Sequence, residues 1–241
     1  MDNQTYIGRF YDFVPPMDKI ARNLVLTVFN GTLASIGFPG QIYCATCITN
    51  SGFFVSINNG SPSVGNQVDE LGQFLPLNIF KILSTTHNAN FDEFQHELLK
   101  LQTDFPLIVN VASGNGNFKS CEFSPVGQIS QCYQPNDDPF ISTNHFLNPF
   151  WNLSNPQFDS WLSSARRDNL IHQLNRCQQW QLTDLIDIMN LPFDKGGAKV
   201  GENLYRLIFN GDTFHLYLSN SDDDDDDDDH WLDIDLAGYF Q

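Results

Sequence analysis

The order in which short apolar runs and longer amphipathic segments alternate is the feature that most limits the fold of this chain. Between residues 24 and 60 the apolar runs are short, rich in β-branched and aromatic residues, and separated by Gly, Pro and Asn. Residues 24–29 end at an Asn-Gly hairpin signal, and residues 52–57 end at an Asn-Asn-Gly turn. This pattern is typical of strands, so we expect two in this part of the chain.

Two blocks of helical periodicity interrupt the strands. Asn90 and Glu93 have the spacing of a capping box and precede apolar residues at helical intervals, and residues 160–190 carry two more apolar stripes. Residues 107–123 have the pattern of a hairpin, and residues 204–234 return to strands around an Asn-Gly-Asp turn. This order predicts an α+β domain in which sheets pack face to face and helices cover the outside.

The charge balance argues against two classes of partner. The chain has 29 acidic residues, 12 Lys or Arg residues and a formal net charge of −17, and leaving out the eight charges of Asp222–Asp229 still gives −9. Nucleic acid and anionic membrane surfaces require clustered cations, so we expect neither partner. No stretch reaches the roughly 18 apolar residues of a membrane span, and Asp2 stands where a signal peptide carries basic residues. We expect one soluble domain over residues 1–241.

The cysteines form an odd set spread over a long chain: Cys44, Cys47, Cys121, Cys132 and Cys177. Such a set is typical of reduced thiols and therefore of a cytoplasmic location. The Cys-x-x-Cys spacing of the first two also suggests zinc or redox chemistry. Residues three apart on a strand point to opposite faces, however, so we interpret these two as packing thiols. We expect no metal or cofactor.

The Asp222–Asp229 tract is the other unusual feature of the composition. It lacks the alternating ligands, the Gly and the terminal Glu of a calcium loop, so we do not interpret it as a calcium site. Adjacent like charges repel one another and remain solvated. We expect a solvated acidic loop between the last two strands.

Five short segments, taken in chain order, suggest a family. They are Gly8–Asp12 (GRFYD), Asn50–Asn59 (NSGF followed by INN), Cys121–Pro125 (CEFSP), Thr143–Phe146 (TNHF) and Ser164–Arg167 (SARR). Together they resemble the choloylglycine hydrolase and acyl-coenzyme A:penicillin acyltransferase group of Ntn hydrolases, which includes acid-ceramidase-like proteins. Phe10 departs from the pattern, because the family usually has Asn at that place.

The resemblance implies a fold and an activity. The fold would be a four-layer αββα sandwich built on two antiparallel sheets. The activity would be cleavage of a linear carbon–nitrogen amide, such as a conjugated bile acid, a penicillin side chain or an N-acyl lipid, or transfer of the acyl group. The partner would be a small-molecule N-acyl amide, and a homo-oligomer is possible because family members often assemble.

The resemblance also implies the chemistry and its first two residues. Family members use an N-terminal Cys exposed by processing, and its own α-amino group, with an ordinary pKa of about 8, serves as the base. Arg9 would lie beside this nucleophile and favour the thiolate. Asp12 would accept a hydrogen bond from the α-amino group.

The rest of the implied site is an oxyanion hole with a second arginine. Asn59, through its backbone N–H, and Asn144, through its side-chain amide, would bind the oxyanion, an arrangement worth about 3 to 4 kcal/mol per donor. Asn58 takes the place of Asn59 if the register is shifted by one residue. Arg167 would orient these groups and compensate the developing negative charge.

Each of these residues also fits an ordinary structural role. Arg9 and Asp12 are compatible with a solvated pair at a strand end, and Arg167 has the polar neighbours of an exposed helix face. The Asn residues at positions 58, 59 and 144 are common turn formers. The functional interpretation requires these side chains to converge on one cleft between two stacked sheets, and the structural interpretation does not.

The family's nucleophile is missing from the sequence. In the family a Cys lies a full strand upstream of the Arg, whereas residues 1–8 contain no Cys. A Met thioether has no activatable proton, and Thr5 is too near Arg9 to match the family's spacing. We therefore expect the chain by itself to be inactive. Either it is an amidase with its Cys upstream of Met1, or it is a pseudoenzyme that binds an apolar acyl ligand, which its 21 Phe residues favour.

Overall fold

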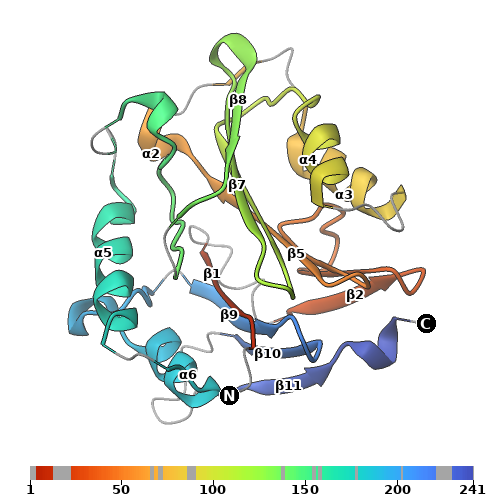
Figure 1. Cartoon of the computed structure of the whole chain (residues 1–241), viewed down its shortest axis with the longest axis vertical. Coiled ribbons are helices and arrows are strands. Elements are labelled where there is room, and N and C mark those ends of the chain that lie inside the picture. Colours follow the sequence, from red (N-terminus) through yellow and green to blue (C-terminus); the bar gives the residue numbers. More distant parts are fainter. Residues whose placement is uncertain are drawn as a thin grey trace.

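The strands of this protein form two antiparallel sheets, shown in Figure 1. The structure is a computed structural model. The residues that it describes are 4–12, 23–65, 68–69, 73–85, 91–136, 139–153, 156, 159–176, 179–201, 203–220 and 230–240. Among these residues, no helix is both long enough and apolar enough to cross a membrane.

The two sheets differ in size and in strand order. The smaller sheet has the order β1 (Tyr6–Asp12), β9 (Asn203–Asn210), β10 (His215–Asn220) and β11 (Leu232–Asp235). The larger sheet follows chain order: β2 (Val25–Phe29), β3 (Leu33–Gly37), β4 (Thr46–Thr49), β5 (Phe53–Asn59), β6 (Leu107–Ser113), β7 (Phe118–Ser124) and β8 (Ile129–Tyr133). The first strand of the chain thus pairs with one from its last quarter.

The strands expected from the sequence are confirmed. Strands occupy residues 25–29, 53–59 and 107–113, and the final third returns to strands at β9 to β11. The Asn-Gly signal after β2 makes a hairpin turn in which Asn30 and Gly31 have φ angles of 50° and 64°. Because this region of φ favours glycine and asparagine, the dipeptide fixes the turn.

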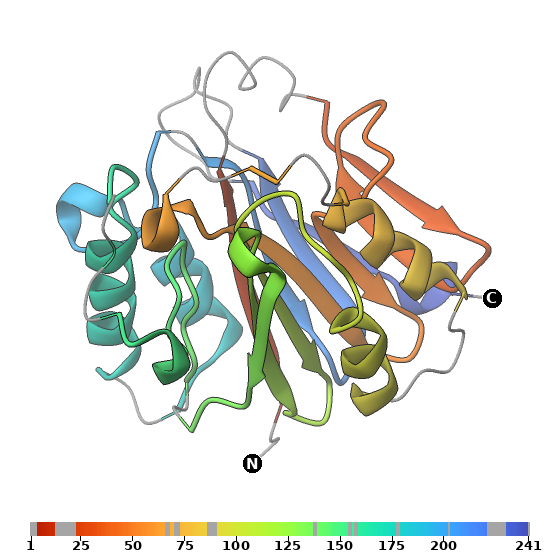
Figure 2. The ribbon, with the colours of Figure 1, turned by 90° about the horizontal axis from the view of Figure 1, so that it is seen from above.

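Helices lie on both outer faces of the paired sheets, as Figure 2 shows. They are α2 (Ser61–Val64), α3 (Leu75–Thr85), α4 (Phe91–Leu98), α5 (Ser163–Leu174) and α6 (Leu182–Asn190). Short 3₁₀ turns lie at Val126–Gln128, Pro149–Trp151, Phe193–Lys195 and Ala237–Tyr239. The α+β class and the four-layer αββα sandwich predicted from the sequence are therefore confirmed.

Apolar side chains pack in two buried layers. Between the sheets, Phe54 of β5 stacks on Phe209 of β9, with ring centroids 6.1 Å apart. Outside the larger sheet, Phe94 of α4 packs in the same buried cluster as Val109 of β6. β5 contributes to both layers because alternate residues of a strand point to opposite faces.

α6 lies directly against the outer face of the smaller sheet. It contacts both β1 and β9. A Cβ built at Gly8 of β1 would come within 3.3 Å of Met189 Sδ on α6. The absence of a side chain at Gly8 therefore allows this close packing of helix on strand.

The prediction of reduced thiols is wrong for four of the five cysteines. Cys121 of β7 and Cys132 of β8 stand opposite each other in the larger sheet and form a disulfide. Cys44 and Cys47 form a second. The Cys-x-x-Cys pair meets because Cys44 lies before β4 begins, so the alternation rule for strands does not apply to it. The cytoplasmic location, which was inferred from reduced thiols, loses this support.

Three predictions fall on parts of the chain outside the described residues. They concern the helix cap at Asn90, the thiol of Cys177 and the acidic loop Asp222–Asp229. The helix that we expected after Asn90 is present as α4.

Candidate active site

A cavity of about 1540 Å³ runs along β1. All nine residues from Gln4 to Asp12 line it. A strand presents alternate residues to opposite faces, so a cavity that touches every residue must run along the strand's edge. β9 pairs with one edge of β1, and no described strand pairs with the other. The cavity therefore lies at the unpaired edge of β1.

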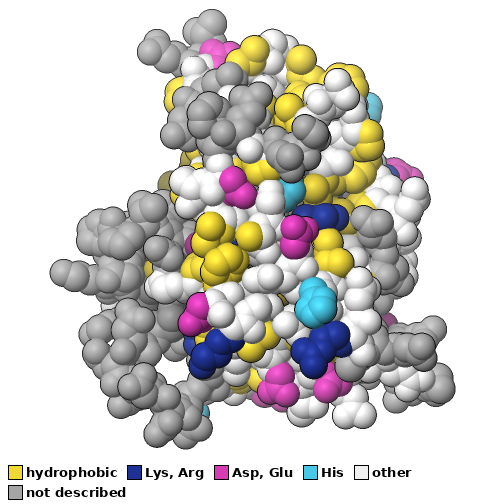
Figure 3. Space-filling view, turned by 90° about the vertical axis from the view of Figure 1, so that its left-hand side faces the viewer, with side chains coloured by type: hydrophobic (Ala, Val, Ile, Leu, Met, Phe, Trp, Pro, Cys, Tyr) yellow, Lys and Arg dark blue, Asp and Glu magenta, His cyan; other side chains and the backbone are white. Residues whose placement is uncertain are grey.

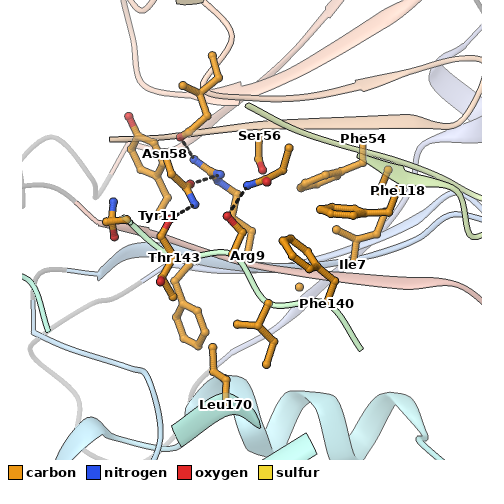
Figure 4. Close-up of a pocket in the computed structure, with 18 of the residues that line it drawn as sticks. Ile7, Arg9, Tyr11, Phe54, Ser56, Asn58, Phe118, Phe140, Thr143 and Leu170 are labelled. Atoms are coloured by element: carbon orange, nitrogen blue, oxygen red, sulfur yellow. Dashed lines mark hydrogen bonds between the residues drawn. The ribbon is translucent and has the colours of Figure 1, made fainter. Parts of the chain in front are cut away.

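The larger sheet, two helices and one loop line the rest of the cavity. β5 and β6 of the larger sheet form one wall, and α5 and α6 form the opposite wall. The irregular segment 139–144 crosses between them. Figure 4 shows a polar group around Arg9, Asn58 and Thr143, with an apolar group made by Ile7, Phe54, Phe118 and Phe140 beside it.

Arg9 is a buried cation, 7% exposed, at the polar end of the cavity. Its guanidinium donates to Asn58 Oδ1 at 3.0 Å and to the Ile57 carbonyl at 2.8 Å, and it lies 5.3 Å from the centroid of the Tyr11 ring. No carboxylate among the described residues forms an ion pair with Arg9. A buried positive charge whose described partners are all neutral favours an anion in the adjacent space.

Asp12 points away from Arg9, towards α5. Its carboxylate accepts from Arg166 Nη1 at 2.5 Å and from Asn203 Nδ2. The pairing of β1 with β9 is irregular between Tyr11 and Asp12, which alters the direction of the side chain at this end of the strand. Arg9 and Asp12 therefore flank the unpaired edge of β1 from its two sides.

The asparagines on β5 connect Arg9 to the segment that carries Asn144. Asn58 accepts from Arg9 through Oδ1 and donates through Nδ2 to the Thr143 carbonyl at 3.0 Å. Asn144 Nδ2 donates to the Asn59 carbonyl at 3.1 Å. An amide NH₂ group has two N–H donors, so this bond uses one of the two that Asn144 carries. All of these residues line the cavity.

The second arginine of the predicted site is displaced by one position. Arg166 lines the cavity, is 6% exposed and binds Asp12, whereas Arg167 donates from Nε to the Ile141 carbonyl at 3.2 Å and is not among the lining residues. Successive helical residues point about 100° apart, so only one of two neighbours faces the cavity. Ser164–Arg167 is the Ser-x-x-Arg segment expected from the sequence, and Ser163 and Arg166, one residue earlier, have the same spacing.

Of the predicted site residues, Arg9, Asp12, Asn59 and Asn144 line this one cavity, whereas Arg167 does not and its neighbour Arg166 does.

Glu122, to which the sequence gave no role, does not line the cavity but binds the segment that follows Asn144. It is 1% exposed and accepts from the backbone N–H groups of Leu147 and Asn148, at 2.5 and 3.2 Å, and from Trp151 Nε1 at 2.6 Å. Burial raises its pKa to about 7, and the three donors act in the opposite direction. Its place in the third family-like segment was the only sequence signal for it.

The face over α5 and α6 carries charges of both signs. In Figure 3, Lys and Arg side chains on this face lie among Asp and Glu side chains and scattered hydrophobic groups. The described residues of this face therefore present a mixed surface around the helices that wall the cavity.

Comparison with known proteins identifies the fold. No protein-family model and no curated protein matches the chain. A solved structure of a Caenorhabditis elegans N-acylethanolamine-hydrolyzing acid amidase ortholog superposes with a TM-score of 0.58 at 15% identity, over 86% of this chain and 87% of that chain. A variant of conjugated bile acid hydrolase from Clostridium perfringens gives a TM-score of 0.48 at 11% identity, over 100% of this chain and 88% of that chain. The first likeness shows that this chain has the Ntn-hydrolase sandwich fold.

Proposed function

We propose that this protein hydrolyses a linear carbon–nitrogen amide bond of a small N-acyl substrate. The single observation that carries the proposal is the convergence of Arg9, Asp12, Asn59 and Asn144 on one cavity at the unpaired edge of β1. These residues come from distant parts of the chain and match the polar groups that N-terminal nucleophile chemistry requires. The amidase with the same fold, at 15% identity, is consistent with this function.

The nucleophile in this proposal is an N-terminal Cys on a strand upstream of Met1. β1 offers backbone hydrogen-bonding groups along the edge that no described strand occupies. A strand added there would hold its first residue in the cavity, between Arg9 and Asp12. Arg9 would stabilise the thiolate, because it is a buried cation that no described carboxylate neutralises.

The reaction follows from these positions. The thiolate adds to the amide carbonyl, and the α-amino group, oriented by Asp12, passes the thiol proton to the leaving nitrogen. Asn144 Nδ2 and the backbone N–H of Asn59 donate to the oxyanion. Water then hydrolyses the thioester, releasing the acid and restoring the thiol. Arg166, and not Arg167, holds Asp12 in place by its ion pair.

Mass spectrometry of the mature N-terminus, combined with an amidase assay, tests the proposal. We expect protein from its native source to begin at a Cys before Met1 and to hydrolyse N-acyl amides. Asn144→Ala should lower kcat by at least about 100-fold. Arg176→Gln, at an exposed residue just after α5, should leave kcat within about twofold. A mature chain that begins at Met1 or Asp2 contradicts the proposal.

A binding protein without catalysis is the second candidate. It is favoured by the apolar side of the cavity, formed by Ile7, Phe54, Phe118 and Phe140. Such a protein would be stabilised by N-acyl amides without turning them over, since ligands that bind only the folded state raise the unfolding temperature. A thermal shift without hydrolysis selects this candidate, and the absence of both removes it.

A further inference from the structure

The segment Thr143–Asn148 contains no helix or strand, yet its backbone N–H groups are bound by side chains from three separate elements. Asn144 N donates to Ser163 Oγ of α5 at 2.8 Å, and Phe146 N donates to Ser63 Oγ of α2 at 2.6 Å. The next two N–H groups donate to the Glu122 carboxylate of β7. The loop that presents Asn144 is thus fixed by side chains, in the way that a strand is fixed by its neighbours.

Ser163 makes the contact nearest to Asn144. Its side chain is fully buried, at 0% exposure. Its Oγ lies 2.8 Å from Asn144 N, 2.8 Å from His145 Nδ1 and 3.0 Å from Thr143 Oγ1. A hydroxyl has one donor and two acceptor sites, and these three partners can use all of them. One oxygen atom therefore binds three consecutive residues of the loop.

The start of α5 holds Ser163 itself in place. The Asp159 carboxylate accepts from the backbone N–H groups of Ser163 and Ser164, at 2.5 and 3.1 Å, and so caps the helix. Arg166, on the same helix turn, binds Asp12. Ser163 therefore links the Asn144 loop to the helix that orients Asp12.

His145 joins this network through Nδ1, 2.8 Å from Ser163 Oγ. Burial, followed by the nearby positive charge of Arg167, lowers the pKa of the ring, and Asp159 and Asp168 oppose this effect. Because the Ser163 hydroxyl donates its proton to Thr143 Oγ1, Nδ1 of the His145 ring is the donor to Ser163 Oγ.

We propose that Ser163 is a positioning residue that holds the Asn144 side-chain amide in register with the Asn59 carbonyl and the cavity. The proposal rests on the proposed function for its catalytic meaning, but its structural content is independent of activity. Without the Ser163 hydroxyl, the Asn144 N–H loses its partner and the loop is no longer tied to α5 at that residue. The Asn144 amide would then sample orientations that do not point at a bound carbonyl.

NMR of the Asn144 side-chain amide in the chain itself tests this without any substrate. The resonance is identified by its loss in Asn144→Asp. In Ser163→Ala, we expect its hydrogen exchange to accelerate by about tenfold or more, as expected for loss of one buried hydrogen bond. Ser61→Ala is the matched control, because Ser61 is also a buried first residue of a helix and its hydroxyl has no hydrogen-bond partner among the described residues. An unchanged Asn144 amide in Ser163→Ala, or an equal change in Ser61→Ala, overturns the proposal.

Two further measurements keep the test decisive. In the wild-type chain, the backbone N–H of Asn144 should exchange at least about tenfold more slowly than an unprotected amide. Exchange at the unprotected rate overturns the proposal. This measurement does not require Ser163→Ala to fold. In the processed enzyme, Ser163→Ala should lower kcat and leave KM within about twofold, because the interaction is used in the transition state. If no amidase activity exists but the NMR result holds, the proposed function fails and the positioning role stands.

Discussion

Two adjacent arginines on α5 have different partners because successive residues of a helix point in different directions. Arg166 binds Asp12 in a buried pair, with side chains 8% and 25% exposed, whereas Arg167 binds a backbone carbonyl. Arg166→Gln should lower the free energy of unfolding by about 2 kcal/mol, since removing one partner leaves a largely buried charge, discounted here for the exposure of Asp12. Arg167→Gln should cost less than about 1 kcal/mol. Urea unfolding of both variants measures the difference, and equal losses would contradict the assignment of Arg166.

Glu122 should give the protein a pH-dependent stability. Its pKa is raised by burial from 4.5 to about 7 in the folded state. A raised pKa means that the folded state binds the proton more tightly, so this contribution is fully present below about pH 4.5 and is lost as the pH rises through about 7. The shift corresponds to at most about 3 kcal/mol over that window.

Glu122→Gln should remove this slope, because the variant cannot titrate at that position. Urea unfolding at several pH values between 4.5 and 7 measures it. Glu97→Gln is the control: Glu97 is exposed, and its pKa is lowered by Lys100, so its variant should keep the wild-type slope. If Glu122→Gln and the wild type lose stability in parallel across this window, the buried carboxyl is not the cause.

At the scale of elements, the disulfide between β7 and β8 ties the last strand of the larger sheet to its neighbour. Cys121 and Cys132 are opposite residues of the ladder, with Cα atoms 4.0 Å apart. Closing a loop of about 12 residues restricts the unfolded chain by about 3 kcal/mol. The double variant Cys121→Ala with Cys132→Ala should lose about this much on urea unfolding. Non-reducing peptide mapping checks the bond, and free thiols at both positions in the folded protein would contradict it.

Elements with strong local signals could be predicted from the sequence, and others could not. The Asn-Gly turn specified the hairpin after β2 because its backbone geometry favours those residues. β4 has four residues and no alternation, because all four are buried. α3 (LPLNIFKILST) was not predicted, although its buried Leu75, Ile79 and Leu83 recur at helical spacing. β8 was missed as well, and with it the partner of Cys121.

The same limit applies to the site. Arg9, Asp12 and Asn144 were predicted because short family-like segments contain them. Their convergence depends on β1 pairing with β9, across nearly the whole chain, and no local pattern encodes such a pairing. The choice between Arg166 and Arg167 depends on which side of α5 faces β1. That rotation is fixed by packing, which a motif with two adjacent arginines does not specify.

At the scale of the whole molecule, the docking of the two sheets places the cavity. Tyr11 of β1 stacks on Tyr205 of β9, with ring centroids 4.9 Å apart, and both rings belong to the core between the sheets. Arg9 lies two residues before Tyr11 on the same face of β1 and reaches Asn58 of the larger sheet. The polar end of the site therefore begins where this aromatic packing stops, and it depends on both sheets keeping their relative position.

A hydrogen bond between the two sheets tests this dependence. The hydroxyls of Tyr205 on β9 and Thr46 on β4 lie 2.7 Å apart, and both residues are fully buried. Tyr205→Phe should lower the free energy of unfolding by about 1 to 2 kcal/mol, because it leaves the Thr46 hydroxyl buried without this partner. Thr46→Val should cost a similar amount, and the double variant should cost no more than either, giving a coupling of about 1 kcal/mol.

Tyr217→Phe on β10, whose ring is only half-buried, is the control and should change stability by less than about 0.5 kcal/mol. Additive losses in the double variant would mean that this hydrogen bond does not hold the two sheets together. Other contacts between the sheets would then have to keep Arg9 next to Asn58.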